Sequence, residues 1–501
     1  MSFAQLCGAD SPGRQAACRQ LVLMAHSLGL EQIRLSWCDQ HGQLRGKTIM
    51  LQALEKALQN GIGMVSTILL KDTSDRTVYQ VFEDGGVADL PGFEAASNLV
   101  LLPDPASFKQ LPWAHQTGWL QCQAWFQNGQ PVLLDTRHQL QNALVLLGQL
   151  GWQMQCGLEV EFHIYKAVSQ VADQGSNLGW QNALDPQQAA WPGPAPQLQL
   201  IHQGYHLLSE LLSDTAHEPL HIVQQTAQAL GLPLTSLEIE LGPSQVEAVF
   251  DVTDALTAAD NMVLFRSAVT QALRRKGFYA TFMCRPPFPH IMSSGWHLHQ
   301  SLVDPNGVNL FAREGKLVAA VPAREAEEIL SLKGSQWLAG LLQHAKAMSA
   351  LATPTINGFE RFRPHAMAPQ SICWGQDNRG AMLRVVGKAG DASTHIENRL
   401  GEPAANPYLY VASQIHAGLD GIAQKLQAPT ATLSPYAEAA NKLPASLGEA
   451  LEHLRQSTTY NAGFGNSFVN YFCRVKQSEL DRFAAAKDPL AWQKHEYLGR
   501  I

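Results

Sequence analysis

MQCGLEVEFHIYK, residues 154–166, places two glutamates at alternate positions among apolar residues. We interpret this stretch as a β-strand. Because side chains alternate between the two faces of a strand, Glu159 and Glu161 point to the same face. The apolar residues beside them predict a covered strand, on which two neighbouring carboxylates repel each other unless a cation joins them. Taken alone, the pair fits a metal site and a solvated polar face equally well.

A second carboxylate-bearing segment is SLEIELGPSQVEAVFDV, residues 236–252. It is typical of a strand, a Gly-Pro turn and a returning strand. The turn allows Glu247 to come close to Glu240, whereas we expect Glu238 to face the solvent. The segment therefore offers further carboxylates for the same kind of site.

A pair of histidines lies in SSGWHLHQS, residues 293–301. His297 and His299 occupy alternate positions, so they share one face of the strand that we predict here. A single histidine is usually an ordinary core or surface residue, and a pair just after a Ser-Ser-Gly loop is a better candidate for a ligand. The pattern by itself remains a weak signal because it also occurs by chance.

Arginines lie on the apolar segments NRGAMLR and HIENR, which carry Arg379, Arg384, Glu397 and Arg399. Only 16% of the residues in this chain are charged, against about 25% in an average protein, so this clustering is informative. Arginines in such places typically clamp a phosphate or a carboxylate. The alternative is an ion pair between Arg399 and Glu397 that braces two strands.

The composition of the 501 residues excludes several classes of protein. A net charge of −7 argues against a mainly electrostatic nucleic-acid partner. No apolar run approaches the roughly 18 residues that a membrane span needs, and the first residues do not read as a secretory signal. The eight cysteines form no CxxC motif, which predicts small core residues in a cytoplasmic protein.

The candidate ligands predict a particular chemistry. At least five carboxylates and two histidines on covered strands suit Mg²⁺ or Mn²⁺ better than Zn²⁺. Divalent ions together with arginines indicate phosphoryl transfer. The chain has neither a GxxxxGK[ST] loop nor a GxGxxG motif, so a fold of another kind would have to hold the phosphate donor.

Local patterns predict a small α+β domain over residues 15–115, followed by helices that alternate with the strands described above. Thr136 is a candidate cap for the first of these helices. The elements expected are a hairpin at 31–50 and helices at 134–151, 253–277, 335–352 and 406–426.

In this order and spacing, the motifs resemble those of glutamine synthetases and of the related γ-glutamyl–amine ligases. The resemblance extends over about residues 31–500. Its carriers are GLEVEF, EIELGPSQVE, SGWHLHQSL, PTINGFERFRP, WGQDNR, IENR and NPYLYVASQIHAGLDGI. It implies an α+β fold with an N-terminal β-grasp domain, residues 15–115, and a catalytic domain, residues 116–501, with a curved antiparallel sheet and flanking helices. It also implies homo-oligomers of stacked rings, commonly dodecamers, with active sites between neighbouring subunits.

The resemblance assigns roles to individual residues. It implies one metal ion held by Glu161, Glu240 and Glu247, and another held by Glu159, His297 and Glu397. For glutamate, the resemblance implies Arg361, Arg399 and Glu161. For ATP, it implies His299, Ser301 and Arg384. Arg379 and Arg384 are implied as catalytic residues that stabilise the transferred phosphoryl group.

Three departures from the family pattern concern the amine. Ammonia-using members carry a glutamate six residues after the arginine matched by Arg361, where this chain has Met367. The usual Asn-Gly before Ser-Gly reads Met292-Ser293, and the Asp-Gly-Ser-Ser loop has no counterpart in residues 61–80, although Asp72 or Asp75 are candidates to replace its aspartate. Lys442 replaces a tyrosine that many bacterial members adenylylate, which argues against that regulation.

The resemblance implies an ATP- and Mg²⁺-dependent (or Mn²⁺-dependent) ligase that works on the γ-carboxylate of glutamate through γ-glutamyl phosphate. The departures predict that it joins this carboxylate to an organic amine. A thioether neither balances an ammonium charge nor accepts a proton, so Met367 and Met292 favour an uncharged aromatic amine such as aniline. The alternatives are a γ-glutamyl ligase for alkylamines or polyamines, glutamine synthetase itself, and a non-catalytic relative.

Overall fold

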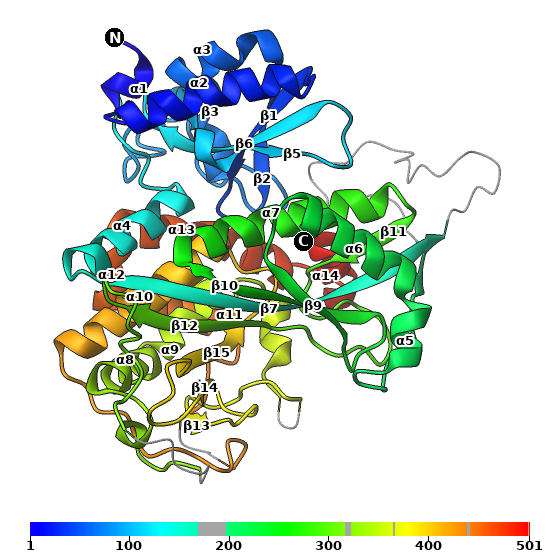
Figure 1. Ribbon diagram of the computed structural model, residues 1–501, viewed down its shortest axis with the longest axis vertical. Helices are drawn as coiled ribbons and strands as arrows, with labels where there is room; N and C mark the ends of the chain where they lie inside the picture. Colours follow the sequence, from blue (N-terminus) through cyan, green and yellow to red (C-terminus); the bar gives the residue numbers. More distant parts are fainter. Residues whose placement is uncertain (169–196, 316–321, 364–365, 438–440, 499, 501) are drawn as a thin grey trace.

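The computed structural model describes residues 1–168, 197–315, 322–363, 366–437, 441–498 and 500. Its N-terminal part forms a sheet with the strand order β2-β1-β6-β4-β3, in which β5 also pairs with β6. Helices cover this sheet at the top of Figure 1. The elements are α1 (Phe3–Leu6), α2 (Pro12–Ser27), β1 (Gln32–Cys38), β2 (Leu44–Met50), α3 (Leu54–Asn60), β3 (Ile62–Val65), β4 (Asn98–Pro103), β5 (Lys109–Gln110) and β6 (Thr117–Trp125).

The larger sheet has the order β13-β14-β15-β12-β7-β10-β9, and β8 and β11 also pair with β7. The long strand β7 runs through the middle of the lower part of Figure 1. Every pairing in this sheet is antiparallel except that of β13 with β14. Its strands are β7 (Gln153–Val168), β8 (Gln197–Leu200), β9 (Leu234–Ile239), β10 (Gln245–Asp254), β11 (Phe278–Thr281), β12 (Trp296–Val303), β13 (Trp374–Gln376), β14 (Leu383–Val386) and β15 (His395–Gly401).

Helices flank the larger sheet and form most of the core with it. Helix α7 contacts β7, β10 and β11, while α10 contacts α4, α7, α8 and α9. Large side chains such as Trp296 and Trp337 are fully buried between these layers. The helices are α4 (Thr136–Gln149), α5 (Glu210–Thr215), α6 (His217–Ala229), α7 (Ala255–Arg274), α8 (Leu332–Gln343), α9 (Ala345–Ala352), α10 (Pro407–Ala423), α11 (Leu447–Gln456), α12 (Thr458–Phe464), α13 (Asn466–Ala484) and α14 (Pro489–Tyr497).

Most of the predicted elements are confirmed, and two details were wrong. Asp135 caps α4 in place of Thr136, because its carboxylate accepts from the backbone N–H groups of residues 137 and 138. The helix predicted over 335–352 is two helices, α8 and α9, which meet at His344. The Nε2 atom of His344 lies 2.7 Å from the Asp420 carboxylate on α10, so the break supplies a contact between helices.

The position of strand β6 concerns the boundary between the two predicted domains. It pairs in parallel with β1 and antiparallel with β4, so it belongs to the first sheet although it follows residue 115. The division at 115 stays a prediction, and strand pairing favours a boundary after residue 125.

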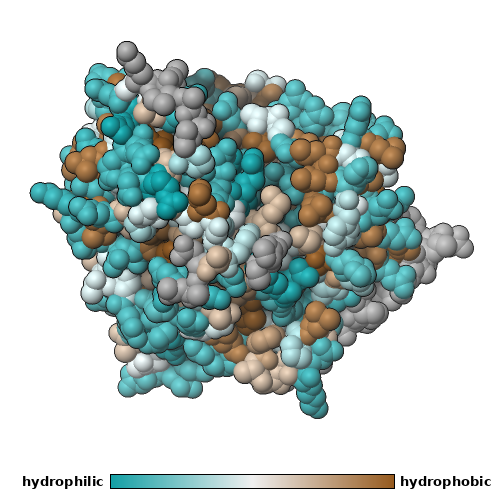
Figure 2. Space-filling model, turned by 90° about the horizontal axis from the view of Figure 1, so that it is seen from below, coloured by the Kyte–Doolittle hydropathy of each residue, from teal (hydrophilic) through white to brown (hydrophobic). Residues whose placement is uncertain are grey.

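Among the described residues, no helix has the length and apolar composition that a membrane crossing requires. Figure 2 shows one face of the molecule, on which hydrophobic side chains form separate small groups among hydrophilic ones.

Candidate active site

Neighbouring strands of the larger sheet bring four of the predicted ligands to one face. Glu159 on β7 lies opposite His297 on β12, and Glu161 on β7 lies opposite Glu247 on β10. Directly opposed residues of antiparallel strands project to the same side of a sheet. The period of two along β7 therefore gathers all four side chains into one cluster.

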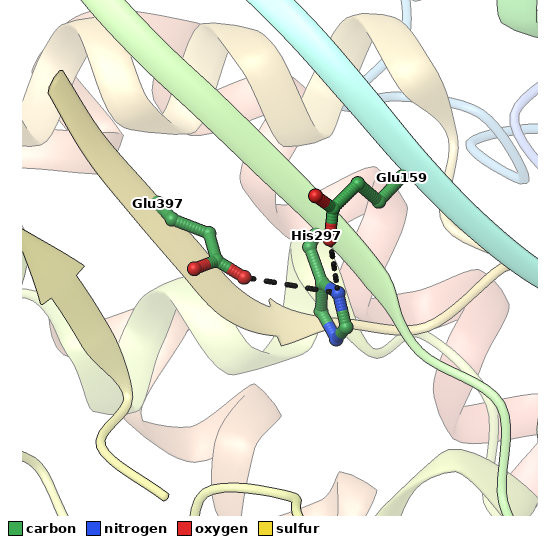
Figure 3. A group of neighbouring side chains, drawn as sticks. All are labelled: Glu159, His297 and Glu397. Carbon is green, nitrogen blue, oxygen red and sulfur yellow. Dashed lines mark hydrogen bonds and ion pairs between the residues drawn. The ribbon is translucent and has the colours of Figure 1, made fainter. Parts of the chain in front are cut away.

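His297 lies at the centre of this cluster (Figure 3). Its Nδ1 atom is 3.1 Å from Glu159 Oε2 and 3.7 Å from Glu397 Oε1, and the three residues come from β7, β12 and β15. The same Nδ1 atom lies 3.8 Å from Glu247 Oε1, and the Nε2 atom lies 3.9 Å from Glu161 Oε1. Two groups of possible metal ligands result, Glu159–His297–Glu397 and Glu161–Glu247–His297.

The cluster concentrates negative charge where water is largely excluded. Burial, followed by repulsion from Glu161, raises the pKa of Glu247 to about 10. Burial and the charge of Glu240 raise the pKa of Glu161 to about 7. Burial, followed by the charge of Arg399, lowers the pKa of His297 to about 4. A cation at this place would relieve the repulsion and favour the ionised carboxylates.

The donor atoms fit a divalent metal ion. Glu247 Oε1 and His297 Nε2 are buried and have no hydrogen-bond partner within the described parts of the chain. Buried polar atoms of this kind call for a missing partner such as an ion. Carboxylate oxygens with a single imidazole suit Mg²⁺ or Mn²⁺. The geometry thus agrees with the predicted ligands, and Glu159, His297 and Glu397 form one of the two predicted sets.

Glu240 and Glu238 lie beside the cluster at the end of β9. Glu240 is half-buried, and its Oε2 atom accepts from the Leu241 N–H group at 3.0 Å. Its charge raises the pKa values of both Glu161 and Glu247, but the geometry of the described residues leaves it outside the two groups of possible ligands. Glu238 lies opposite Glu247 and is half-buried, so the expectation that it faces the solvent was only partly right.

Two arginines hold Glu397, which is fully buried. Arg384 Nη1 donates to Glu397 Oε2 at 3.0 Å, and Arg399 Nη1 donates to Glu397 Oε1. Burial alone would raise the pKa of Glu397, but His297 and Arg399 hold it below its ordinary value. The ion pair that the sequence offered as an alternative role for Arg399 is therefore present. Arg379, by contrast, is exposed.

Comparisons with known proteins decide the family. A model of the glutamine synthetase catalytic domain matches residues 133–495. The chain belongs to the glutamine synthetase family. It is 38% identical to a γ-glutamylanilide synthase from Acinetobacter over 493 residues, which cover 95% of this chain and 94% of that protein. It is 29% identical to a γ-glutamylethanolamide synthetase from Streptomyces coelicolor, covering 91% of this chain and 90% of that protein.

Solved structures agree with this family at the level of the fold. A structure of GmaS in complex with ADP superimposes with a TM-score of 0.74 at 24% identity. The match covers 96% of this chain and 99% of that chain. The predicted fold, an N-terminal β-grasp domain followed by a catalytic domain of the glutamine synthetase type, is thereby confirmed.

Arg361, which the family pattern assigns to glutamate, lies in the short helix η6 (Asn357–Arg361). It is 3% exposed, and its Nη1 atom donates to the Arg399 carbonyl at 2.8 Å. Its guanidinium packs against Gly295, where any Cβ atom would collide with it. The Gly295 N–H group in turn donates to Glu161 at 2.7 Å. Arg361 is therefore built into the floor of the site beside the carboxylate cluster.

On the predicted nucleotide side, His299 and Ser301 continue the same face of β12. His299 Nε2 lies 3.1 Å from Glu159 Oε1, and its Nδ1 atom lies 2.9 Å from His395 Nε2. Ser301 lies opposite residue 155, at the far end of the pairing with β7. The structure therefore joins His299 directly to the metal-ligand cluster, and its role toward ATP stays a prediction.

The two methionines predicted for the amine pocket lie on loops. Met367 is 51% exposed and has a φ of 51°, a left-handed conformation that is unusual for its side chain. Its carbonyl accepts from Arg399 Nη2 at 3.2 Å, which ties the loop to the site. Met292 is half-buried next to Gly242, where a Cβ atom would meet it. That the two side chains line one pocket stays a prediction.

The candidate replacements for the missing ammonium-binding aspartate have partners of their own. Asp72 is buried, and its carboxylate accepts from Arg482 Nε at 3.0 Å and from two backbone N–H groups of its own loop. Asp75 lies 3.1 Å from Arg45. Both carboxylates are thus engaged in contacts that hold the loop, which weakens the case for either as an ammonium ligand.

Two site residues were missed from the sequence. Gln245, two positions before Glu247 on β10, donates to Glu161 at 3.1 Å and to Ser294 Oγ at 3.0 Å. His395, two positions before Glu397, contacts His299. The same alternation that identified the glutamates would have placed both side chains on the site face.

Proposed function

We propose that this chain is an ATP-dependent ligase that joins the γ-carboxylate of glutamate to an organic amine, most readily an aromatic amine such as aniline. The observation that carries the proposal is the pair of oxygen-rich ligand groups that share His297, next to Arg384 and Arg399, in a member of the glutamine synthetase family. The likeness to a γ-glutamylanilide synthase supports the choice of amine.

In the proposed reaction, an oxygen of the glutamate γ-carboxylate attacks the γ-phosphorus of ATP, and the bond from that phosphorus to the ADP oxygen breaks. The amine nitrogen then attacks the acyl carbon of γ-glutamyl phosphate, inorganic phosphate leaves, and the nitrogen loses a proton. Divalent metal ions, when bound, neutralise the phosphate and carboxylate charges that meet here.

The residues of the chain would divide this work by position. Glu159, His297 and Glu397 would hold one metal ion, and Glu161, Glu240 and Glu247 the other. Arg361 would bind the α-carboxylate of glutamate, with Arg399 on the same side, because a guanidinium matches a carboxylate with two parallel hydrogen bonds. Arg379 and Arg384 would stabilise the transferred phosphoryl group, while His299 and Ser301 would contact ATP.

The residues proposed to line the amine pocket favour an uncharged amine as the substrate. Ammonium entering a site lined by methionine would lose hydration without meeting a countercharge. An aromatic ring would gain about 25 cal/mol for each Å² of apolar area buried. Met367 and Met292 are the side chains proposed to supply that area. The second candidate is a ligase for alkylamines or amino alcohols, which the likeness to a γ-glutamylethanolamide synthetase favours.

An amine panel tests the proposal. ADP release would be measured with glutamate, Mg²⁺ and either aniline, ethanolamine, a polyamine or ammonium, and each product would be identified by its mass. We expect the highest catalytic efficiency with aniline. A ratio of aniline to ammonium efficiencies below one would reject the aromatic amine. No glutamate-dependent ADP release with any amine would indicate a non-catalytic relative.

The proposal extends to assembly and location. We expect a homododecamer of stacked rings in the cytoplasm, in keeping with the family. All eight cysteines are free thiols, six of them buried, which suits a reducing compartment. Native mass spectrometry of the purified chain would measure the number of subunits.

A further inference from the structure

The C-terminal helix α14 contacts the short helix η6 that carries Arg361. Gln493 on α14 is 5% exposed and lies against two residues of η6. Its Oε1 atom accepts from Asn357 Nδ2 at 2.6 Å, and its Nε2 atom donates to Glu360 Oε1 at 2.9 Å. A glutamine amide offers both an acceptor and a donor, and here they bind the first residue of η6 and the residue directly before Arg361.

A second contact fixes the start of the same segment. The Tyr497 hydroxyl, at the end of α14, accepts from the Ile356 N–H group at 3.1 Å and donates to the buried carboxylate of Glu479 on α13. Residues 356, 357 and 360 are therefore all held by one helix. The bond to Ile356 holds the backbone at the start of η6, and the bonds to the Asn357 and Glu360 side chains hold the short turn from which Arg361 projects.

Helix α14 is itself firmly placed. The Glu496 carboxylate is fully buried and accepts from Arg482 at 2.6 and 2.8 Å and from Ser74 Oγ at 2.7 Å. The Leu498 carbonyl accepts from the Tyr279 hydroxyl at 2.7 Å. These contacts join α14 to α13, to the N-terminal part of the chain and to β11, so the helix is a rigid support for η6.

The geometry points to Gln493 as a positioning residue that holds Arg361 in the orientation in which it binds glutamate. This inference rests on the proposed role of Arg361. The far end of Arg361 is fixed by the Arg399 carbonyl and by Gly295, and its near end is fixed by Gln493 through Asn357 and Glu360. Gln493 would not touch substrate, so its loss should weaken the binding of glutamate and leave the binding of ATP unaffected.

Calorimetry on the full-length assembly tests the inference. The affinity for glutamate would be measured with Mg²⁺ and a non-hydrolysable ATP analogue, so that the result does not depend on turnover. In Gln493→Glu, a carboxylate faces Glu360 and the donor is lost. We expect about tenfold weaker glutamate binding, the usual range for a lost hydrogen bond to a charged group, with analogue affinity unchanged.

A double variant separates positioning from general damage. In Glu360→Gln combined with Gln493→Glu, the new glutamine donates and the new glutamate accepts, so the pair is rebuilt with its roles exchanged. We expect glutamate affinity to return to within about threefold of the wild type. Leu490→Ala, on the same helix but 61% exposed, is the control and should leave both affinities unchanged.

Several outcomes would overturn the inference. One is an unchanged affinity for glutamate in Gln493→Glu. Another is an equal loss of affinity for glutamate and for the ATP analogue. The third is a double variant whose affinity for glutamate does not recover. If Gln493→Glu does not fold, Gln493→Met removes both bonds without adding charge and is judged by the same criteria. A wild type that binds glutamate but ligates no amine would reject the proposed function alone, whereas one that binds no glutamate would reject both.

Discussion

The two sides of the candidate site are built from different kinds of structure. The proposed metal side rests on β7, β10, β12 and β15, where paired strands place Glu159, Glu161, Glu247 and His297 on one largely buried face. The proposed amine side rests on loops, and Met367, which is predicted to belong to it, is half exposed in a left-handed conformation. Strand pairing dictates where the first group of side chains points, whereas the loop depends on a few tethering contacts.

This difference separates what all members of the family must do from what can vary. Phosphoryl transfer requires fixed charges, and a sheet holds them with little freedom to move. Recognition of the amine requires only a pocket of suitable polarity, and loops change more easily than the strands that support them. Substitutions on the two sides should therefore differ in kind, with loss of catalysis on one side and a change of substrate preference on the other.

The largest effect is expected on the metal side. Glu161→Ala should lower ATP-dependent turnover by about 10³-fold or more, because loss of a ligand removes several kcal/mol of charge compensation in phosphoryl transfer. Turnover would be measured at saturating Mg²⁺, with the assembly checked by size. Glu83→Ala, at an exposed position outside both ligand groups, is the control. Near-normal turnover of Glu161→Ala would reject the ligand assignment.

A buried carboxylate at the end of the metal side should affect the stability of the fold. Glu402, just after β15, is fully buried and accepts from the N–H and hydroxyl groups of Thr355 at 2.7 and 2.8 Å. Burial raises its pKa to about 7. A carboxyl with a raised pKa in the folded state contributes stability below about pH 4.5 that is lost as the pH rises through 7, in total about 3 kcal/mol.

Glu402→Gln should remove this loss while keeping an acceptor for the Thr355 N–H group. Relative to the wild type, the variant should therefore gain about 2.5 kcal/mol in free energy of unfolding between pH 5 and pH 8. Denaturant titrations without metal at both pH values would measure this difference. The same change at Glu83, which is exposed, provides a control. A difference that does not depend on pH would mean that Glu402 is already ionised at pH 5.

The sequence predicted the metal side because the information is local. Glu159 and Glu161 are two positions apart on one strand, and so are His297 and His299, so the period of two is enough to group them. Gln245 and His395 obey the same rule and were overlooked. Glutamine had not been considered as a site residue, and the segment HIENR was considered only for Glu397 and Arg399. Element boundaries were less secure, since Asp135 and Thr136 are both good caps and only the backbone geometry chooses between them.

The remaining features depend on contacts between distant parts of the chain. Strand β6 joins the first sheet by pairing with β1, whose residues lie 85 positions earlier, and no local pattern reveals this. The support of η6 by α14 links Asn357 to Gln493 across 136 positions. The half-exposed, left-handed state of Met367 follows from its own loop and the bond to Arg399, so its identity could be read from the sequence but its setting could not.

An intermediate effect is expected at Arg361, which lies between the two sides. Arg361→Lys should raise the KM for glutamate about 30-fold, equivalent to about 2 kcal/mol, because lysine cannot reproduce a bidentate contact with a carboxylate. The KM for ATP should stay within about twofold. Arg363→Lys, a nearby and largely exposed position, serves as the control. If the KM for ATP rose and that for glutamate did not, Arg361 would belong to the nucleotide side.

The smallest effect is expected at Met367, where the change should affect preference and leave the chemistry intact. Met367→Glu places a carboxylate near the amine and should lower the ratio of aniline to ammonium efficiencies about tenfold, since the charge disfavours an apolar ring and favours a cation. Good ammonium activity need not appear, because the aspartate of the family's ammonium site has no counterpart that is free of other contacts. Met50→Glu, at a methionine that is 54% exposed on β2, is the matched control. An unchanged ratio of efficiencies in Met367→Glu would mean that Met367 does not line the amine pocket. A loss of turnover with every amine would mean that its loop is needed for catalysis and does not only select the amine.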